Sequence, residues 1–535
     1  MSAHADSARR PVRMASEDVP FSDPVAYGNG PNDSVTDKTE NAAITHHDIT
    51  LGGKPIRYTA RAGHVVTVDP SSSEPDAKIF YVSFTAENAQ PAERPVTFFY
   101  NGGPGSSSVY VLLGSFAPMR IKTSLPGFTP PAPYEIETNQ DSLLDRSDLV
   151  FINPVGTGYS AAIAPKVNKD FWGTDQDAAS LKQFIKRYLT VYDRWNSPKF
   201  LFGESYGTAR SCVLAYMLHE DGVDLNGVTL QSSILDYAQA GNPIGLMPTW
   251  ATDAWYHHKV TLQPPPPDLS ALAAQATAFS ASQYEAALKQ RPHPYAAIVR
   301  GLSAQIGIDP ETLQSWNIDI AAVNDRSTYL FLLTLLQSRG LALGAYDGRA
   351  TGIDTGIAAR IDPKSGANDP AMTAVNGADT AMWNTYLNED LRFTSTSSFT
   401  DLNDQAFANW DFHHTDPTGA ERGIDATGNV ILYTAGDLAA VMSLNVDLKV
   451  LSANGYYDSV TPFYQTMRDL QAMPLVNTKV RQNLTIRCYP SGHMIYLDGS
   501  SRTTLKEDLA RLYDSATADR PAMARIRALE QSRRR

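Results

Sequence analysis

The chain has 535 residues, of which 42% are hydrophobic and 19% charged, and this is the composition of an ordinary globular protein. It excludes a fibrous repeat and a chain that is disordered throughout, and the length allows about three domains or one large domain with an insertion. The net charge of −12 argues against nucleic acid or an anionic membrane as the main partner. With only two cysteines, Cys212 and Cys488, a scaffold built on disulfides is also excluded.

Both ends of the chain are polar. No run approaches the roughly 18 apolar residues of a transmembrane helix. The arginines near the N-terminus are not followed by an apolar stretch, so no secretory signal is visible and the compartment stays open. We predict a flexible leader over residues 1–40 and a solvated C-terminal tail over 516–535.

Residues 41–240 show the pattern of alternating strands and helices. Alternating apolar residues from His47 onward predict hairpin strands. A helix with one buried stripe is predicted from Thr174. Four short apolar runs follow the hairpins, at 96–100, 149–152, 199–202 and 227–234. Strands that alternate with helices form parallel sheets, so this region predicts the first part of an α/β core.

The strand rhythm stops near Gly241. Residues 241–423 contain alanine-rich helical patterns and loops rich in glycine, asparagine and threonine, with four prolines at 264–267. We predict that this stretch is an inserted, largely helical cap. Short apolar runs return over 424–515, which predicts the second part of the core.

The sequence Gly-Glu-Ser-Tyr-Gly at 203–207 directly follows a predicted strand and precedes a predicted helix. Glycines on both sides permit a sharp turn that exposes the hydroxyl of Ser205 at the edge of the sheet. A serine needs a base to accept its proton and a carboxylate to orient that base. His493 and Asp458 each follow a late apolar run, which gives the order Ser, Asp, His of an α/β-hydrolase.

A hydrolase of this kind also needs backbone N–H groups to hold the developing oxyanion. One comes from the residue after the nucleophile, here Tyr206, and one from a glycine-rich loop after an earlier strand. The loop Asn-Gly-Gly-Pro-Gly at 101–105 fits the second place. By itself it could be a plain turn, and a phosphate-binding loop is disfavoured because no Gly-Lys-Ser/Thr follows.

Five blocks together resemble the serine carboxypeptidases. They are NGGPGSSS (101–108), NPVGTGYS (153–160), GESYG (203–207), NGYYDSVTP (454–462) and SGHM (491–494), in family order. The resemblance implies that Ser205 is the nucleophile, His493 the general base and acid, and Asp458 its orienting carboxylate. It implies Gly103 and Tyr206 as the oxyanion donors. It further implies that Asn101, Gly102 and Glu204 bind the free α-carboxylate of a peptide.

The role that the resemblance implies for Glu204 makes chemical sense. An ionised Glu204 repels a substrate carboxylate, whereas a protonated one donates a hydrogen bond to it, so binding should favour acidic pH. His493 must be neutral to accept the proton of the serine, which requires the opposite. We therefore expect a pH optimum that is a compromise.

Three positions depart from the family pattern. Ser106 replaces a usual cysteine, so the disulfide that this cysteine often makes to the cap is absent. Ser115 lies where the family has a glutamate that shares a proton with Glu204, and Phe99 replaces a common tryptophan. Without that glutamate, the pKa of Glu204 should be lower than in relatives that have the pair. We expect weak or strongly acid-dependent peptidase activity.

We predict an α/β-hydrolase that releases C-terminal residues from peptides through an acyl-enzyme, without a cofactor. An esterase or acyltransferase on the same triad is the alternative, and a binding protein with a decayed site is a third. Three histidine doublets lack the spaced partners of a metal site. Both cysteines are expected to be buried and free. The expected partner is a peptide with a free C-terminus, not a membrane or nucleic acid, and the oligomeric state is left open.

Overall fold

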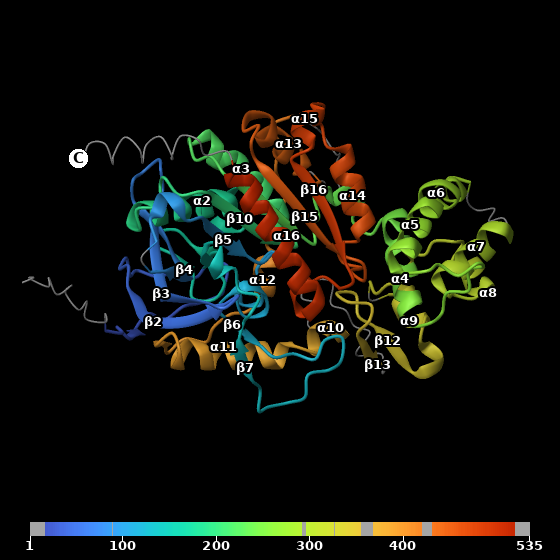
Figure 1. Cartoon of the computed structure of the whole chain (residues 1–535), viewed down its shortest axis with the longest axis horizontal. Coiled ribbons are helices and arrows are strands. Elements are labelled where there is room, and N and C mark those ends of the chain that lie inside the picture. The colour runs from blue at the N-terminus through green and yellow to red at the C-terminus, as the bar shows by residue number, and fades with distance from the viewer. Residues whose placement is uncertain are drawn as a thin grey trace, which may run out of the picture.

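The computed structural model describes residues 17–87, 89–290, 296–325, 327–354, 368–419 and 431–518. A ten-stranded sheet forms the body of the molecule (Figure 1), with nine strands in the order β16-β15-β11-β10-β5-β8-β4-β3-β2 and β9 attached to β4. No helix in these ranges has the length and apolar character needed to cross a membrane.

The sheet has a parallel half and an antiparallel half. The parallel half consists of β8 (Asp148–Ile152), β5 (Val96–Tyr100), β10 (Lys199–Glu204), β11 (Gly227–Gln231), β15 (Lys449–Gly455) and β16 (Leu484–Tyr489). The antiparallel half consists of β2 (Ala42–Leu51), β3 (Lys54–Val68), β4 (Pro75–Ala86) and β9 (Ala161–Ala162). The inner parallel strands are continuous apolar runs because both of their faces are covered. The predicted α/β-hydrolase architecture is confirmed.

Helices cover both faces of this sheet. One face packs against α2 (Thr174–Val191), α3 (Tyr206–Glu220) and α13 (Ala435–Leu444), and the other against α16 (Gly499–Thr517) and α11 (Asn376–Glu389). Successive side chains of a strand point to opposite faces, so Phe98 and Tyr100 join the first core and Phe99 the second. This layering leaves the carboxyl ends of the parallel strands available for a site.

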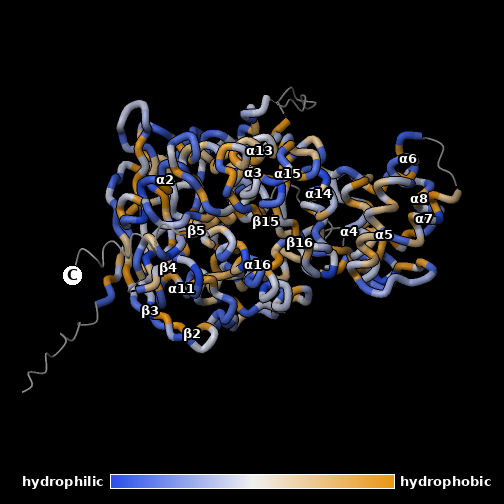
Figure 2. Tube along the Cα trace, turned by 45° about the horizontal axis from the view of Figure 1, so that its top comes forward, coloured by the Kyte–Doolittle hydropathy of each residue, from blue (hydrophilic) through white to orange (hydrophobic). Residues whose placement is uncertain are grey.

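The first part of the predicted cap forms a separate helical lobe at one end of the body (Figure 1). Its helices are α4 (Pro243–Tyr256), α5 (Leu269–Phe279), α6 (Glu285–Leu288), α7 (Ala296–Ile306), α8 (Pro310–Ser315) and α9 (Leu330–Thr334). They enclose their own apolar core, in which the Trp250 ring stacks on that of Phe331 at 4.5 Å. Figure 2 shows apolar residues in the region of α4 and α5.

The second part of the predicted cap packs against the body instead. It comprises the hairpin of β12 (Leu341–Leu343) and β13 (Thr351–Ile353), then α10 (Pro370–Thr373), α11, β14 (Phe393–Ser395) and α12 (Asp404–Ala408). Trp383, Tyr386 and Leu387 form a stripe on α11 that is buried in the core beside the sheet. The single cap predicted over 241–423 is therefore divided, because this stripe needs the apolar surface that the sheet provides.

Residues 17–40 differ from the flexible leader predicted for them. The strand β1 (Phe21–Asp23) pairs in parallel with β14, and Val19 pairs with Ile44. Val35 pairs with Ile163 and is buried. Backbone pairing to an element about 370 residues later has no local sequence signal, which is why composition suggested a free leader. Residues 1–16 of the predicted leader and 519–535 of the predicted tail lie outside the described residues.

Candidate active site

Ser205 lies in a strained turn between β10 and α3. Its backbone has φ 60° and ψ −129°, a conformation that side-chain-bearing residues rarely adopt. At Gly203 a Cβ atom would lie 2.1 Å from the carbonyl oxygen of Gly207, so only glycine fits there. The N–H of Ser205 donates to the carbonyl of Gln231 at 3.0 Å. The turn therefore has the geometry that the G-x-S-x-G pattern predicts.

The glycine loop after β5 lies directly against this turn. A Cβ atom on Gly102 would lie 2.5 Å from the backbone nitrogen of Tyr206, so the two backbones touch. Gly103 has φ 98°, which favours glycine. The structure thus places the two expected oxyanion donors on adjoining segments.

His493 and Asp458 follow β16 and β15, which are neighbours in the sheet. Asp458 Oδ2 and His493 Nδ1 are 2.8 Å apart, and both side chains are buried. Asp458 Oδ1 accepts hydrogen bonds from the N–H groups of Val460 and Thr461 at 2.9 and 3.0 Å. With Nδ1 donating to this anchored carboxylate, Nε2 is the ring nitrogen left to face a reactant.

One pocket of about 200 Å³ collects the predicted residues. Asn101, Gly102, Gly103, Glu204, Ser205, Tyr206 and His493 line it, and Asp458 lies behind His493. The rest of the wall is mostly apolar or aromatic and includes Tyr110, Ile234, Tyr237, Tyr346, Met372, Leu402, Phe407, Val460 and Met494. The pocket thus brings the Ser205 hydroxyl, the His493 imidazole and the Glu204 carboxyl together in a mostly apolar surround.

Glu204 is buried and accepts two side-chain hydrogen bonds. The amide of Asn101 donates to Oε1 at 2.8 Å, and the amide of Gln231 donates to Oε2 at 2.6 Å. Burial raises the pKa of Glu204 to about 7, against the opposing charge of His493 and the hydrogen bond from Asn101. Glu204 is consequently protonated below neutral pH and ionised above it.

His493 must be neutral to act as a base, whereas Glu204 must be protonated to bind a carboxylate. Burial by itself lowers the pKa of His493, but the charge of Asp458 and its hydrogen bond outweigh burial, so the pKa lies above its usual value. The negative charges of Glu204 and Asp369 act in the same direction as that of Asp458. The imidazole therefore holds its proton to higher pH than a free histidine does.

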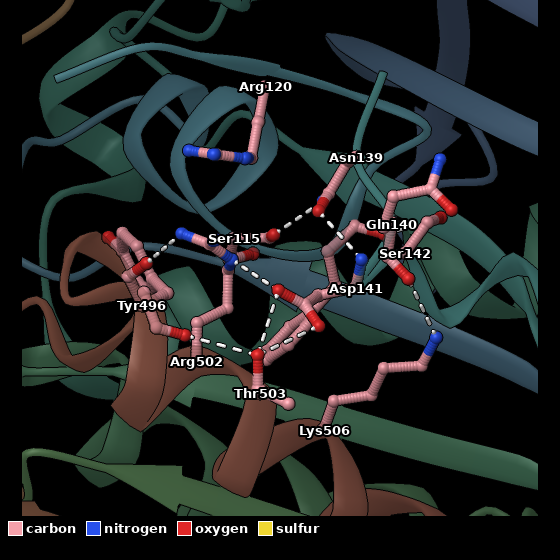
Figure 3. Close-up of polar contacts among 12 residues, drawn as sticks. Ser115, Arg120, Asn139, Gln140, Asp141, Ser142, Tyr496, Arg502, Thr503 and Lys506 are labelled. Carbon is pink, nitrogen blue, oxygen red and sulfur yellow. Dashed lines mark hydrogen bonds and ion pairs between the residues drawn. The ribbon is translucent and has the colours of Figure 1, made fainter. Parts of the chain in front are cut away.

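No carboxyl group reaches Glu204 from position 115. Ser115 lies in a turn of π-helix, η2 (Leu112–Phe116), where its hydroxyl bonds to the carbonyl of Val111. Its own carbonyl accepts from the amide of Asn139 at 2.7 Å, as Figure 3 shows. Burial and the nearby Glu204 raise the pKa of Tyr496 well above its usual value, so this neighbour is a neutral hydroxyl. The lower pKa expected relative to family members with a carboxyl pair stays a prediction.

The insertion also reaches the glycine loop at Ser106. The N–H of Ser107 donates to the carbonyl of Asp401, and the N–H of Asn403 donates to the carbonyl of Gly105, both at 2.8 Å. The amide of Asn403 donates to Gly156 at 2.8 Å. Backbone pairing thus joins the insertion to this loop at the position where the family often has a disulfide. Cys212 is buried, Cys488 is half-buried, and both are free thiols.

The histidine doublets make ordinary hydrogen bonds. His257 bonds to the carbonyl of Gly348 at 2.8 Å, and His414 lies between Asp175 and Asp437 at 2.7 and 2.9 Å. Within the residues that the structure describes, no three His, Cys, Asp or Glu side chains are grouped as they would be around a metal ion.

Several residues of the site were not anticipated from the sequence. Gln231 ends β11 opposite Glu204 in the strand register, and a glutamine within the apolar run at 227–234 is a signal that could have revealed it. The Tyr346 ring meets that of His493 edge-on at 5.1 Å. Tyr346 comes from the insertion, and no local pattern connects it with His493.

These features define the fold of an α/β-hydrolase with a candidate serine-hydrolase site. Residues 53–291 match the family model described as serine carboxypeptidase, which confirms the resemblance found in the sequence motifs. The matched range contains the glycine loop and Ser205 but ends before Asp458 and His493.

Individual relatives support the same class. Serine carboxypeptidase-like 2 of Arabidopsis thaliana is 26% identical over 197 residues, which are 35% of this chain and 42% of the relative. The pheromone-processing carboxypeptidase kex1 of Pyrenophora tritici-repentis is 29% identical over 164 residues, which are 30% of this chain and 22% of the relative. The alignments therefore span less than half of these two relatives.

A solved structure extends the likeness to the whole fold. The prohormone-processing carboxypeptidase Kex1(delta)p of Saccharomyces cerevisiae superposes with a TM-score of 0.51 at 14% identity, covering 86% of this chain and 92% of the other. At this identity the likeness concerns the fold alone. The family model and the sequence relatives thus show a resemblance to the serine carboxypeptidases, and the solved structure shows a shared fold.

Proposed function

We propose that this protein is a serine carboxypeptidase that releases C-terminal residues from peptides. One observation carries the proposal: Ser205 and His493 line the same pocket as Glu204, a buried carboxyl whose pKa is raised to about 7. The first two groups supply a nucleophile and a base. The third can donate a hydrogen bond to the carboxylate that distinguishes a C-terminal residue.

In the proposed reaction the Ser205 hydroxyl attacks the scissile carbonyl while His493 Nε2 takes its proton. Asp458 keeps Nδ1 of His493 protonated and stabilises the imidazolium that forms. The N–H groups of Gly103 and Tyr206 hold the oxyanion. His493 then protonates the leaving amine, and water cleaves the resulting ester by the same steps in reverse.

Recognition of the substrate carboxylate is assigned to Glu204, Asn101 and Gly102. Protonated Glu204 donates to the carboxylate, while Asn101 and Gln231 keep the Glu204 side chain in place. As the pH rises through about 7, Glu204 ionises and repels the substrate, so KM should rise. As the pH falls below the pKa of His493, the base is lost and kcat should fall.

The apolar pocket wall indicates the side chains that the site accepts. Besides Glu204 and His493, the described residues that line the pocket are uncharged, and several are aromatic. A charged substrate side chain would lose its hydration there without gaining a partner. We expect peptides with apolar or aromatic residues beside the cleaved bond to be the best substrates.

A fluorophosphonate probe followed by a matched pair of peptides tests the proposal. The probe should label Ser205 in the folded protein and fail to label Ser205→Ala. A blocked dipeptide with a free C-terminus should then be cleaved, and the same peptide with an amidated C-terminus should be a poor substrate below pH 7. Absence of labelling in folded protein points to a binding protein with a decayed site.

An esterase or acyltransferase is the second candidate. The observation that favours it is the absence of a carboxyl partner at Ser115, which leaves Glu204 to ionise near neutral pH and weakens the selection for a substrate carboxylate. In this case the probe labels Ser205, but simple esters are cleaved faster than either peptide, and the free and amidated peptides do not differ.

A further inference from the structure

The turn between β12 and β13 lies against the loops of both His493 and Asp458. This turn, residues 344–350, belongs to the insertion, yet all its residues are buried except the half-buried Tyr346. In Figure 1 the two strands lie where the helical lobe meets the body. A turn of a surface hairpin is usually exposed, so its burial needs an explanation.

Three backbone hydrogen bonds join this turn to the two loops. The carbonyl of Tyr346 accepts from the N–H of His493 at 2.7 Å. The carbonyl of Ala345 accepts from Ser459 at 2.9 Å, and the N–H of Gly348 donates to Tyr457 at 2.9 Å. The residues on both sides of Asp458 and the backbone of His493 are therefore bonded to one turn.

The turn at 344–350 also packs closely against the loop of His493. At Gly492 a Cβ atom would lie 2.4 Å from the carbonyl oxygen of Tyr346, so the turn and the loop before His493 are in direct contact. The Tyr346 ring packs edge-on against the imidazole. On the other side, the hydroxyl of Ser232 donates to the carbonyl of His493 at 2.6 Å. The backbone of His493 is fixed from two directions, and the insertion supplies one of them.

Arg349 holds the turn in this place. Its guanidinium makes a bidentate ion pair with Asp347 at 2.8 to 3.3 Å within the turn. The Nη1 atom donates to the carbonyl of Pro490 and to Asp498, both at 2.9 Å. The guanidinium also lies 5.0 Å above the ring of Tyr457. One buried cation thus links the turn to the segments that precede His493 and Asp458.

We propose that Arg349 is a positioning residue, which fixes His493 and Asp458 relative to each other by clamping the turn at 344–350 onto both of their loops. The inference rests on the proposed function, because it assigns a role in orienting the base. It goes beyond that function, because the contacts that orient the base come from the insertion and not from the sheet.

Loss of the Arg349 contacts should lower the rate because proton transfer is sensitive to the distance between His493 and Ser205. His493 lies on a loop beyond β16, an edge strand that is only partly buried, so the sheet supports this loop from one side. Loss of the clamp frees the imidazole to shift, and a misplacement of about 1 Å can lower a rate about 100-fold. The proposed substrate-binding residues keep their places, because Glu204 ends β10 and Asn101 directly follows β5.

The test compares Arg349→Gln with Arg349→Lys. We expect Arg349→Gln to slow fluorophosphonate labelling of Ser205 and to lower kcat by about 100-fold, with KM on the blocked dipeptide little changed. Arg349→Lys should give an intermediate rate, because an ammonium can keep the contact to Asp347 or to Pro490 but not both. The split between kcat and KM separates positioning from a general loss of structure.

Arg194→Gln is the matched control. Arg194 is also buried, pairs with Asp148 and donates to the carbonyl of Pro95 at 3.2 Å, but it lies at the opposite ends of the parallel strands. Its loss removes a comparable buried ion pair without touching either loop. This variant should be destabilised yet labelled at the wild-type rate at a temperature where it is folded.

The outcomes separate the two proposals. If wild-type Ser205 is not labelled, the proposed function is wrong. If the wild type is labelled and folded Arg349→Gln reacts at the same rate, the positioning role is wrong and the function stands. Should Arg349→Gln not fold, Arg349→Lys and Asp498→Asn decide, because wild-type rates in both would overturn the inference.

Discussion

The turn of Ser205 and the loop of His493 meet at one pocket but are held in different ways. Ser205 is fixed by its own neighbours, a strand before it, a helix after it and glycines that permit the strained backbone. The His493 loop is fixed by an insertion turn and by Arg349. The comparison teaches that one half of the proposed machinery is encoded locally and the other depends on a distant segment.

The largest effect should come from the locally encoded half. Ser205→Ala removes the proposed nucleophile and should lower kcat by about 10⁶-fold without unfolding the protein. The measurement is hydrolysis of the blocked dipeptide, together with loss of the fluorophosphonate label. Ser211→Ala is the control, since this serine lies on the helix that follows Ser205, is buried and is not among the residues that line the pocket. Residual hydrolysis near the wild-type rate excludes Ser205 as nucleophile.

Asp458→Asn tests the other half directly. An amide keeps the shape of the carboxylate but does not hold His493 in the required tautomer, so kcat should fall by about 10⁴-fold. Labelling of Ser205 should slow in parallel, because the same base activates the serine. An unchanged labelling rate contradicts the assignment of Asp458.

Glu204→Gln replaces a titratable carboxyl in the pocket by an amide that does not titrate, and so tests the residue that directly precedes Ser205. In the wild type, kcat/KM for a peptide with a free C-terminus should fall above pH 7, reaching about tenfold one unit above the pKa. Glutamine donates a hydrogen bond at every pH, so the variant should lose this alkaline decline. The amidated peptide serves as the control, and an identical decline in both proteins shows that another group titrates.

The smallest effect concerns Asp253, which lies on α4 behind the turn at 344–350. Both carboxylate oxygens are buried without a hydrogen-bond partner among the described residues, and burial raises the pKa of Asp253 well above its usual value. The contribution of the neutral carboxyl to the free energy of unfolding is complete below about pH 3.9, the pKa of an aspartate in the unfolded chain. This contribution is lost as the pH rises toward the pKa of Asp253 in the folded protein. Asp253→Asn should therefore raise Tm at pH 8 by roughly 2–4 °C.

The control for Asp253→Asn is the same measurement at pH 4. There the wild-type aspartate is also neutral, so the two proteins should unfold at nearly the same temperature. Tm curves that run parallel from pH 4 to pH 8 contradict the ionisation argument. Because Asp253 packs on Gly348, a small gain in labelling rate at pH 8 is also expected if the turn is held more firmly.

The sequence motifs indicated which residues meet at the pocket better than they indicated the surroundings of the pocket. The runs before Ser205 and Asp458 are buried strands and the run before His493 is a partly buried edge strand, and all three runs are visible without a structure. The division of the insertion was not visible, because the stripe on α11 is compatible with any apolar surface. The packing of residues 17–40 was missed for a similar reason, since β1 pairs with β14 across most of the chain.

By itself, the sequence determined the order of strands and helices, the strained serine turn and the residues from which a triad can be built. These depend on backbone periodicity and on glycine at particular positions, which are local properties. Only the tertiary structure decided that the insertion clamps the loops of His493 and Asp458, and that burial brings the pKa of Glu204 to about 7. Both depend on contacts between segments that are far apart in the sequence, and local sequence patterns do not predict such contacts.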